Sequence, residues 1–213
     1  MKKKLILMCV AGILAGSAII GGTLAGFNTE MKQQGVAQIT TKSMSIGIRE
    51  NNGESQKAEL ETAVAPGTEI PVARSIVNDA PEGYDLYTRV TIYKRWNRDG
   101  LDGRKIHLYL GDTELTMENS EAVSDTDWIL WYADDEQAVM YYRKPLSENQ
   151  ATSEVLSSLK IAGDVNNAYA GAEVILEFDV DAVQKIAAQD AIVSEWGVYP
   201  VIDEDGSIVS ISE

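Results

Sequence analysis

The segment 173–182, with sequence EVILEFDVDA, restricts the fold more than any other part of the chain, because apolar and mostly acidic residues alternate along it. Successive side chains of a β-strand point to opposite faces, so a period of two predicts a strand with one face buried. The segment 85–96 has the same period. Its apolar face carries Leu86, Val90, Ile92 and Trp96, opposite Tyr87, Arg89, Tyr93 and Arg95.

Short apolar runs typical of strands recur through the rest of the chain, at 43–50, 69–77, 105–110, 127–133 and 138–144. Turn signals such as Pro66-Gly67 and Asp99-Gly100 separate them. Few connections are long enough for a crossover helix, which predicts antiparallel pairing. The sequence therefore predicts an all-β fold, an antiparallel β-sandwich with one or two short helices in its connections.

Two segments have helix-like patterns. In 151–159, Thr152 or Ser153 is a candidate N-cap ahead of an apolar stretch, and 183–193 places apolar residues on one helical face. The tail from residue 201 has a turn at Asp205-Gly206 and a weak final strand. With no internal repeat and no second domain, we expect one domain over 42–213.

The N-terminal sequence is typical of an export signal. Three lysines, at positions 2–4, precede an uncharged and mostly apolar run, and small residues end at Gly26. This order of charged, apolar and small residues is typical of a cleaved signal peptide, here 1–26. A retained membrane anchor is the alternative, since the uncharged run is long enough to span a bilayer.

Charge and cysteine content limit the partners and the environment. The net charge of −15 becomes −18 once the three lysines of the signal are removed. A surface this acidic repels nucleic acid and anionic lipid, so neither is an expected partner. The one cysteine, Cys9, lies inside the signal, so the mature chain must rely on core packing rather than on disulfides.

Few residues offer chemistry. The one histidine, His107, lies within the alternating segment KIHLYL and has no H-E-x-x-H motif around it. Zinc enzymes usually recruit two or three histidines, and a serine triad would need this same His107 without a G-x-S-x-G elbow. We expect His107 to be a strand-face residue and the protein not to be an enzyme.

Two acidic clusters stand out, Asp134-Asp135-Glu136 and Asp203-Glu204-Asp205. Paired carboxylates can hydrolyse glycosides, but adjacent acids in turn-like sequence are usually solvated surface. Asp203 and Asp205 are weak candidates for a calcium site, because the twelve-residue EF-hand pattern is missing. No cofactor is expected.

The aromatic residues of neighbouring strand segments have two interpretations. Sheet aromatics can bind sugars, but they more often pack in cores and across strands, and packing is the prediction for this set: Trp128, Trp131, Tyr132, Tyr141 and Tyr142. The glycine-bearing RDGLDGRK segment matches no phosphate-binding loop and is predicted to be a turn.

The signal ends in IIGGTLAGFNTE, where a Gly-Gly-Thr run is followed by small residues and then by Phe27-Asn28. This end resembles the signals of the TasA/camelysin family of exported bacterial proteins, which a SipW-type signal peptidase processes. The resemblance implies cleavage between Gly26 and Phe27. Three parts of the domain also resemble family segments: APGTEIPVARSIVNDAPEGYDLYTRVTI, AVMYYRKPLSENQATSEVLSSLKI, and ILEFDVDAVQ followed by SEWGVYP. The resemblance covers most of the chain.

The resemblance implies a jelly-roll-like sandwich secreted to the surface or extracellular matrix of a Gram-positive bacterium, where TasA-like members form biofilm fibres. It also implies donor-strand exchange, in which a segment near the mature N-terminus adds a strand to the next subunit. The candidate donor is 27–41, whose apolar candidates are Val36 and Ile39. A disordered leader or an ordinary first strand are the alternatives for 27–41.

Other functions stay open at this point. Camelysin-like members have been classed as metalloproteases, although this chain lacks a zinc motif. A monomeric cell-surface adhesin or binding module is another reading. Assembly by self-association, with or without an accessory matrix protein, is what the resemblance favours.

Overall fold

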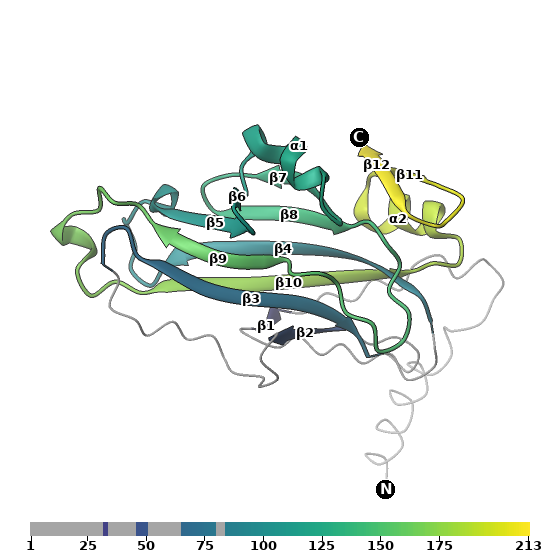
Figure 1. The fold of residues 1–213 in the computed structure, drawn as a ribbon, viewed down its shortest axis with the longest axis horizontal. Coiled ribbons are helices and arrows are strands. Elements are labelled where there is room, and N and C mark those ends of the chain that lie inside the picture. The colour runs from purple at the N-terminus through teal and green to yellow at the C-terminus, as the bar shows by residue number, and fades with distance from the viewer. Residues whose placement is uncertain (1–31, 34–45, 51–64, 80–83) are drawn as a thin grey trace, which may run out of the picture.

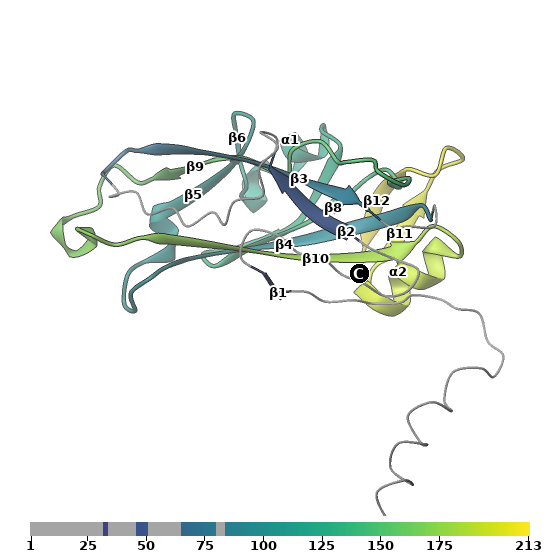
Figure 2. The same ribbon diagram turned by 90° about the horizontal axis from the view of Figure 1, so that it is seen from below.

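The chain folds into two antiparallel sheets that pack face to face (Figures 1 and 2). A computed structural model describes residues 32–33, 46–50, 65–79 and 84–213. Sheet 1 has the strand order β1 (Lys32–Gln33), β10 (Val174–Gln184), β4 (Leu86–Trp96), β8 (Gln137–Tyr142), β7 (Trp128–Ala133). Sheet 2 has the order β2 (Ile46–Glu50), β3 (Glu69–Asn78), β9 (Leu156–Ile161), β5 (Ile106–Leu110), β6 (Thr113–Glu114).

The remaining elements lie in connections and at the C-terminus. They are α1 (Ser120–Ser124), α2 (Ala188–Trp196), the hairpin β11 (Tyr199–Ile202) with β12 (Ile208–Ser212), and the 3-10 turns Gly103–Lys105, Met117–Asn119 and Asn167–Tyr169. The predicted all-β antiparallel sandwich is therefore confirmed, whereas jelly-roll connectivity stays a prediction. Among the described residues, no helix has the length and apolar character needed to cross a membrane.

The alternating segments form the strands predicted from them. β10 pairs with β4 along all of its length, from Val174 opposite Trp96 to Gln184 opposite Leu86, without a break in register. Their apolar faces meet sheet 2 in one core. Its fully buried members include Ile76, Val90, Ile92, Ile106, Leu159 and Val180. Burial of such side chains away from water is the main force that holds the two sheets together.

A second, smaller core lies on the opposite face of sheet 1, where α2 and the β11–β12 hairpin cover it (Figure 1). The sequence assigned Tyr87 to a solvent-facing side, but it is only 1% exposed because this C-terminal unit packs over it. The Tyr87 hydroxyl donates a hydrogen bond to the Gly206 carbonyl oxygen at 2.6 Å. Tyr87 therefore fastens the hairpin to sheet 1.

One flank of the sandwich is closed by its own connection. The chain leaves β6, at the edge of sheet 2, and reaches β7, at the edge of sheet 1, through the Met117–Asn119 turn and α1. Leu115 and Val123 on this connection are buried in the main core. The opposite flank is formed by β10 with β1 in sheet 1, and by β2 and β3 in sheet 2.

Two helix predictions need correction. The segment 151–159 is not helical: Leu156–Ile161 is β9, paired with both β3 and β5, and the predicted cap Thr152 instead accepts the Ile76 backbone N–H. Pairing on both sides outweighs a weak local helix preference. The prediction over 183–193 is right in type, but α2 begins only at Ala188, since Val183 and Gln184 still pair with β4.

Candidate functional site

The candidate site is the outer edge of β10, the side of this strand that faces away from β4. In an antiparallel strand, every second residue directs its backbone N–H and C=O groups towards one neighbouring strand. The residues between them direct theirs to the opposite side. On the side away from β4, the described residues pair with β10 only at Phe178 and Asp179, through β1. β10 is eleven residues long and has neither proline nor bulge. Such an edge is a template for another strand.

Three other strand edges among the described residues carry features that discourage strand addition and that β10 lacks. β7 has an irregular register between Leu130 and Tyr132, and β6 is only two residues long. At the hairpin, the Arg143 guanidinium donates to the carbonyl oxygens of Ile208 and Val209 at 2.9 and 2.8 Å. Pro200 in β11 has no N–H to offer. Bulges, short strands and proline all discourage strand addition, and β10 has none of the three.

The predicted donor segment 27–41 is described only where it forms β1. There, Lys32 lies opposite Asp179 and Gln33 opposite Phe178, antiparallel to β10. Four predicted residues lie outside the described ones: the cleavage residues Gly26 and Phe27, and the donor residues Val36 and Ile39. Part of the segment thus pairs with the open edge, although sequence reasoning named no acceptor strand.

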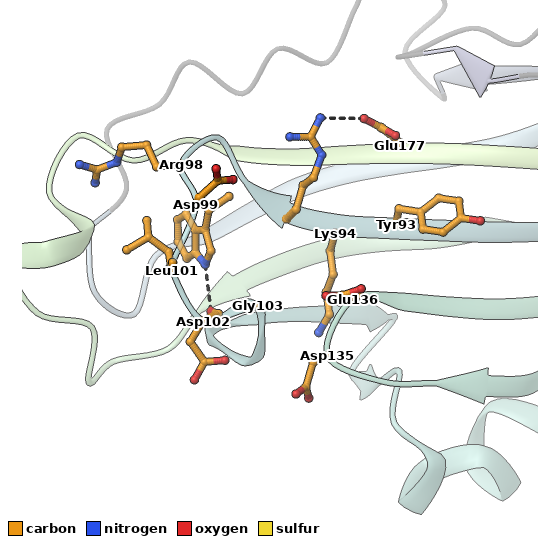
Figure 3. A pocket seen from close by; sticks show the side chains of 13 residues that line it. Tyr93, Lys94, Arg98, Asp99, Leu101, Asp102, Gly103, Asp135, Glu136 and Glu177 are labelled. Carbon is orange, nitrogen blue, oxygen red and sulfur yellow. Dashed lines mark hydrogen bonds and ion pairs between the residues drawn. The ribbon is translucent and has the colours of Figure 1, made fainter.

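A cavity of about 520 Å³ opens at the far end of β4 (Figure 3). The 97–105 loop forms one wall, and the turn at Asp135 and Glu136 forms another. Figure 3 shows charged side chains of both signs around it, including the Arg95–Glu177 ion pair at 2.9 Å. The buried Trp96 donates from Nε1 to the Asp102 carbonyl oxygen at 3.0 Å, which holds the loop against β4.

Lys94 ties the two sheets together at this end. It extends from β4 of sheet 1, and its Nζ donates to the carbonyl oxygen of Ile106 in β5 of sheet 2 at 2.7 Å. Burial lowers the pKa of Lys94, and the nearby carboxylates, Asp135 foremost, oppose that shift. Lys94 also lines a smaller neighbouring cavity of about 250 Å³. The lysine therefore acts as a structural brace between the sheets.

Gly103 makes the closest backbone contact at this site. A Cβ atom added at this position would lie 2.6 Å from the Asp135 carbonyl oxygen. Since this neighbour is backbone, it cannot simply rotate away. We expect Gly103→Ala to lower the free energy of unfolding by about 1–3 kcal/mol, as overpacking does, measured by urea denaturation.

Gly163→Ala is the matched control, because an added Cβ there meets nothing within 4 Å and the glycine φ is ordinary. We expect it to change the free energy of unfolding by less than about 0.5 kcal/mol. Equal effects of the two substitutions would contradict the close packing of the loop against the turn.

The residues singled out for chemistry occupy structural positions. His107 lies on β5 as predicted, with Nδ1 2.6 Å from Oε1 of Glu114. The Asp134–Glu136 cluster is exposed, as predicted, and Asp134 accepts backbone N–H bonds from Glu136 and Gln137 at 2.8 Å. These three bonds stabilise the local turn and strand pairing.

The calcium candidates are also exposed. Asp203 accepts the Ser207 backbone N–H at 2.8 Å, which closes the β11–β12 turn, and Asp205 is exposed in the same turn. Throughout the described part of the chain, no group of three or more His, Cys, Asp and Glu residues is placed to hold a metal ion. The geometry therefore gives Asp203 a turn-closing position.

The aromatic packing prediction is confirmed for four of its five residues, because Trp128, Tyr141 and Tyr142 are buried and Trp131 packs against the second core. The Trp128 and Tyr142 ring centroids lie 5.0 Å apart. Trp131 is half-buried and makes an edge contact with Tyr141. Tyr132 differs, because at the irregular position in β7 it is 42% exposed and its hydroxyl donates to Asp134.

The β10 edge is the feature with the clearest means of binding another chain, since backbone groups need no particular partner side chain. The cavity at the end of β4 is mainly braced by internal bonds. Comparisons with protein-family models, with curated proteins and with solved structures gave no match to this chain.

Proposed function

We propose that the protein is an exported structural subunit of the bacterial cell surface or biofilm matrix, and that its subunits join by donor-strand exchange. A SipW-type signal peptidase removes 1–26, and residues 27–41 of one copy then pair with β10 of the next copy. Repeated head to tail, this contact produces a fibre, with or without an accessory matrix protein. A jelly-roll connectivity of the sandwich and a TasA-like relationship belong to the same proposal.

The observation that carries the proposal is the pairing of β1 with the long, regular edge of β10. The described part of the donor segment, β1, lies on the flank opposite the one that the β6–β7 connection closes. Among the described residues, this contact involves two of the eleven residues of β10, and a longer donor strand could pair along the whole edge.

Charge supports an assembly that depends on strong backbone pairing. Mature subunits of charge −18 repel one another, so electrostatic attraction between copies cannot be the driving force. A row of backbone hydrogen bonds together with apolar burial supplies attraction that does not depend on charge. Salt screens the repulsion over about 10 Å at 0.1 M, so we expect faster assembly with rising salt.

The test compares the mature chain 27–213 with a chain that starts at Lys42. We expect filaments in electron micrographs of the longer chain as its concentration rises, and only monomers from the shorter one, because it lacks the donor. A chain with residues 27–41 in scrambled order, of equal length and charge, is the matched control. It should behave as the truncated chain does.

Cooperative thermal unfolding of all three chains establishes that the sandwich is intact in each. Filaments from the truncated chain would contradict donor-strand exchange. If all three stay monomeric while folded, a monomeric cell-surface adhesin or binding module becomes the better reading, with the cavity beside Lys94 as its candidate site. A camelysin-like metalloprotease would instead cleave a protein substrate in a chelator-sensitive way.

A further inference from the structure

The two pairs that join β1 and β10 define a register that extends beyond them. In an antiparallel ladder, each step forward along one strand is a step back along the other. With Lys32 opposite Asp179 and Gln33 opposite Phe178, an uninterrupted donor strand puts Met31 opposite Val180 and Phe27 opposite Gln184. β10 has no bulge that would shift this register.

The register also selects which donor residues meet the core. Phe178 and Val180 of β10 point into the main core, and residues two apart in a strand share a face. In a donor strand that keeps this register, odd-numbered positions would therefore fall on the core side. β10 spans Val174–Gln184, so donor positions 27–37 have partners in it. The core-side positions are Phe27, Thr29, Met31, Gln33, Gly35 and Ala37, and the solvent-side ones are Asn28, Glu30, Lys32, Gln34 and Val36.

The sequence of the donor is in phase with this register. Its apolar residues fall on the core side with the one exception of Val36, and both of its charged residues, Glu30 and Lys32, fall on the solvent side. A slip by one residue would reverse every position and turn Phe27 and Met31 to solvent. Val36 and Ile39 cannot both face the core of an uninterrupted strand.

A cavity lies where this register ends. It measures about 440 Å³ and is lined by Tyr84, Asp85, Gln184, Lys185 and Ile186. Ile186 is 72% exposed, the highest value among the large apolar side chains of the described residues. An aromatic ring placed there would remove apolar surface from water.

The polar groups of the cavity suit a chain terminus. The Asp85 carboxylate accepts from Ser147 Oγ at 2.7 Å and from Lys185 Nζ at 3.3 Å. The Ser147 hydrogen bond holds the pKa of Asp85 below its usual value, so the carboxylate stays ionised near neutral pH. An ionised carboxylate has about four acceptor positions, which leaves room for the ammonium group of a mature N-terminus.

We infer that, in the assembled protein, the mature N-terminal residue Phe27 of one copy occupies the cavity beside Gln184 and Ile186 of the next copy, with Met31 opposite Val180 on the core side of β10. This inference rests on the proposed function and adds the register and the terminal binding site to it. It also links assembly to processing, since residue 27 has a free ammonium group only after cleavage behind Gly26.

Disulfide trapping between two different copies tests the register, and the mature chain offers no cysteine of its own. Mature Lys32→Cys is mixed with mature, C-terminally tagged Asp179→Cys, assembled and oxidised. We expect a tagged heterodimer on non-reducing gels. Glu177→Cys is the matched control, on the same face of β10 but two residues out of register, and should give at most a tenth of that product.

Substitution of the terminal residue tests the cavity. We expect Phe27→Ala to raise the critical concentration for assembly about tenfold, and Asn28→Ala to change it less than about twofold. Equal effects of these two substitutions, or cross-linking to Glu177→Cys as strong as to Asp179→Cys, would overturn the inference while filaments still form. Absence of filaments from the unsubstituted mature chain, alone and with an accessory matrix protein, would overturn the proposed function itself.

Discussion

Trp128→Ala is expected to lower the free energy of unfolding by about 3–5 kcal/mol, the usual loss for a fully buried large aromatic side chain. Trp128 is 0% exposed and is the largest of the fully buried side chains. Its Nε1 donates to the Glu154 carbonyl oxygen at 2.9 Å, and its ring packs against Tyr142. The substitution opens a cavity in the main core and leaves that carbonyl oxygen without its donor.

Tyr132→Ala is the control for this prediction, because Tyr132 lies on the same strand but is 42% exposed. We expect it to cost less than about 1 kcal/mol. Urea denaturation of both variants, followed by intrinsic fluorescence and by circular dichroism, gives the two losses. A Trp128→Ala loss no larger than that of Tyr132→Ala would mean that this part of the core is not packed as described.

Asp181→Ala is expected to cost about 2–4 kcal/mol of unfolding free energy, because it leaves the Arg89 guanidinium half-buried without its counter-charge. Asp181 is 6% exposed, and its Oδ2 accepts hydrogen bonds from both Nε and an Nη of Arg89 across the β10–β4 pair. Arg89 also lies 5.8 Å from the ring centroid of Trp196 in α2. The pair thus links the sheet to its C-terminal cover.

Glu177→Ala tests the same kind of pair without burial. Glu177 lies on the same face of β10 and pairs with Arg95 at 2.9 Å, but the two side chains are 38% and 55% exposed. Exposed pairs contribute about 0–1 kcal/mol, so this variant should remain close to wild type. The double variant Arg89→Met, Asp181→Leu should recover part of the Asp181→Ala loss. Identical melting curves for the two single variants would refute this account.

Much of the fold could be predicted because burial imposes a period on the sequence. Segment 173–182 alternates since β10 has one face in the main core, and 85–96 alternates for the same reason in β4. The burial of Tyr87, on the face of sheet 1 opposite the main core, could not be predicted from the sequence. It depends on a hairpin more than a hundred residues later in the chain. β9 was missed because Val155, Leu156 and Leu159 fit a helical spacing, whereas the strand Leu156–Ile161 does not alternate regularly.

The candidate site was predictable only in part. The donor segment could be located from the family resemblance and from its low apolar content, but the acceptor strand is set by tertiary pairing. Nothing in the sequence near Gly103 or Lys94 signals their neighbours Asp135 and Ile106, because such proximity arises only when the strands assemble. The spacing of Phe27 and Met31 acquires meaning only with the Lys32–Asp179 register, which the sequence alone does not provide.

The Arg143 guanidinium, which occupies the carbonyl oxygens of Ile208 and Val209, bears on the shape of any assembly. A carbonyl oxygen that already accepts from arginine is a poor partner for an incoming strand, and Pro200 removes a donor from the neighbouring strand. Because the C-terminal hairpin is a poor acceptor for a further strand, strand addition at β10 would lengthen a single filament and would not join filaments side by side. Under the proposed function, Arg143 therefore hinders side-by-side association of filaments. Substitution of Arg143 would be visible as thickened, bundled filaments.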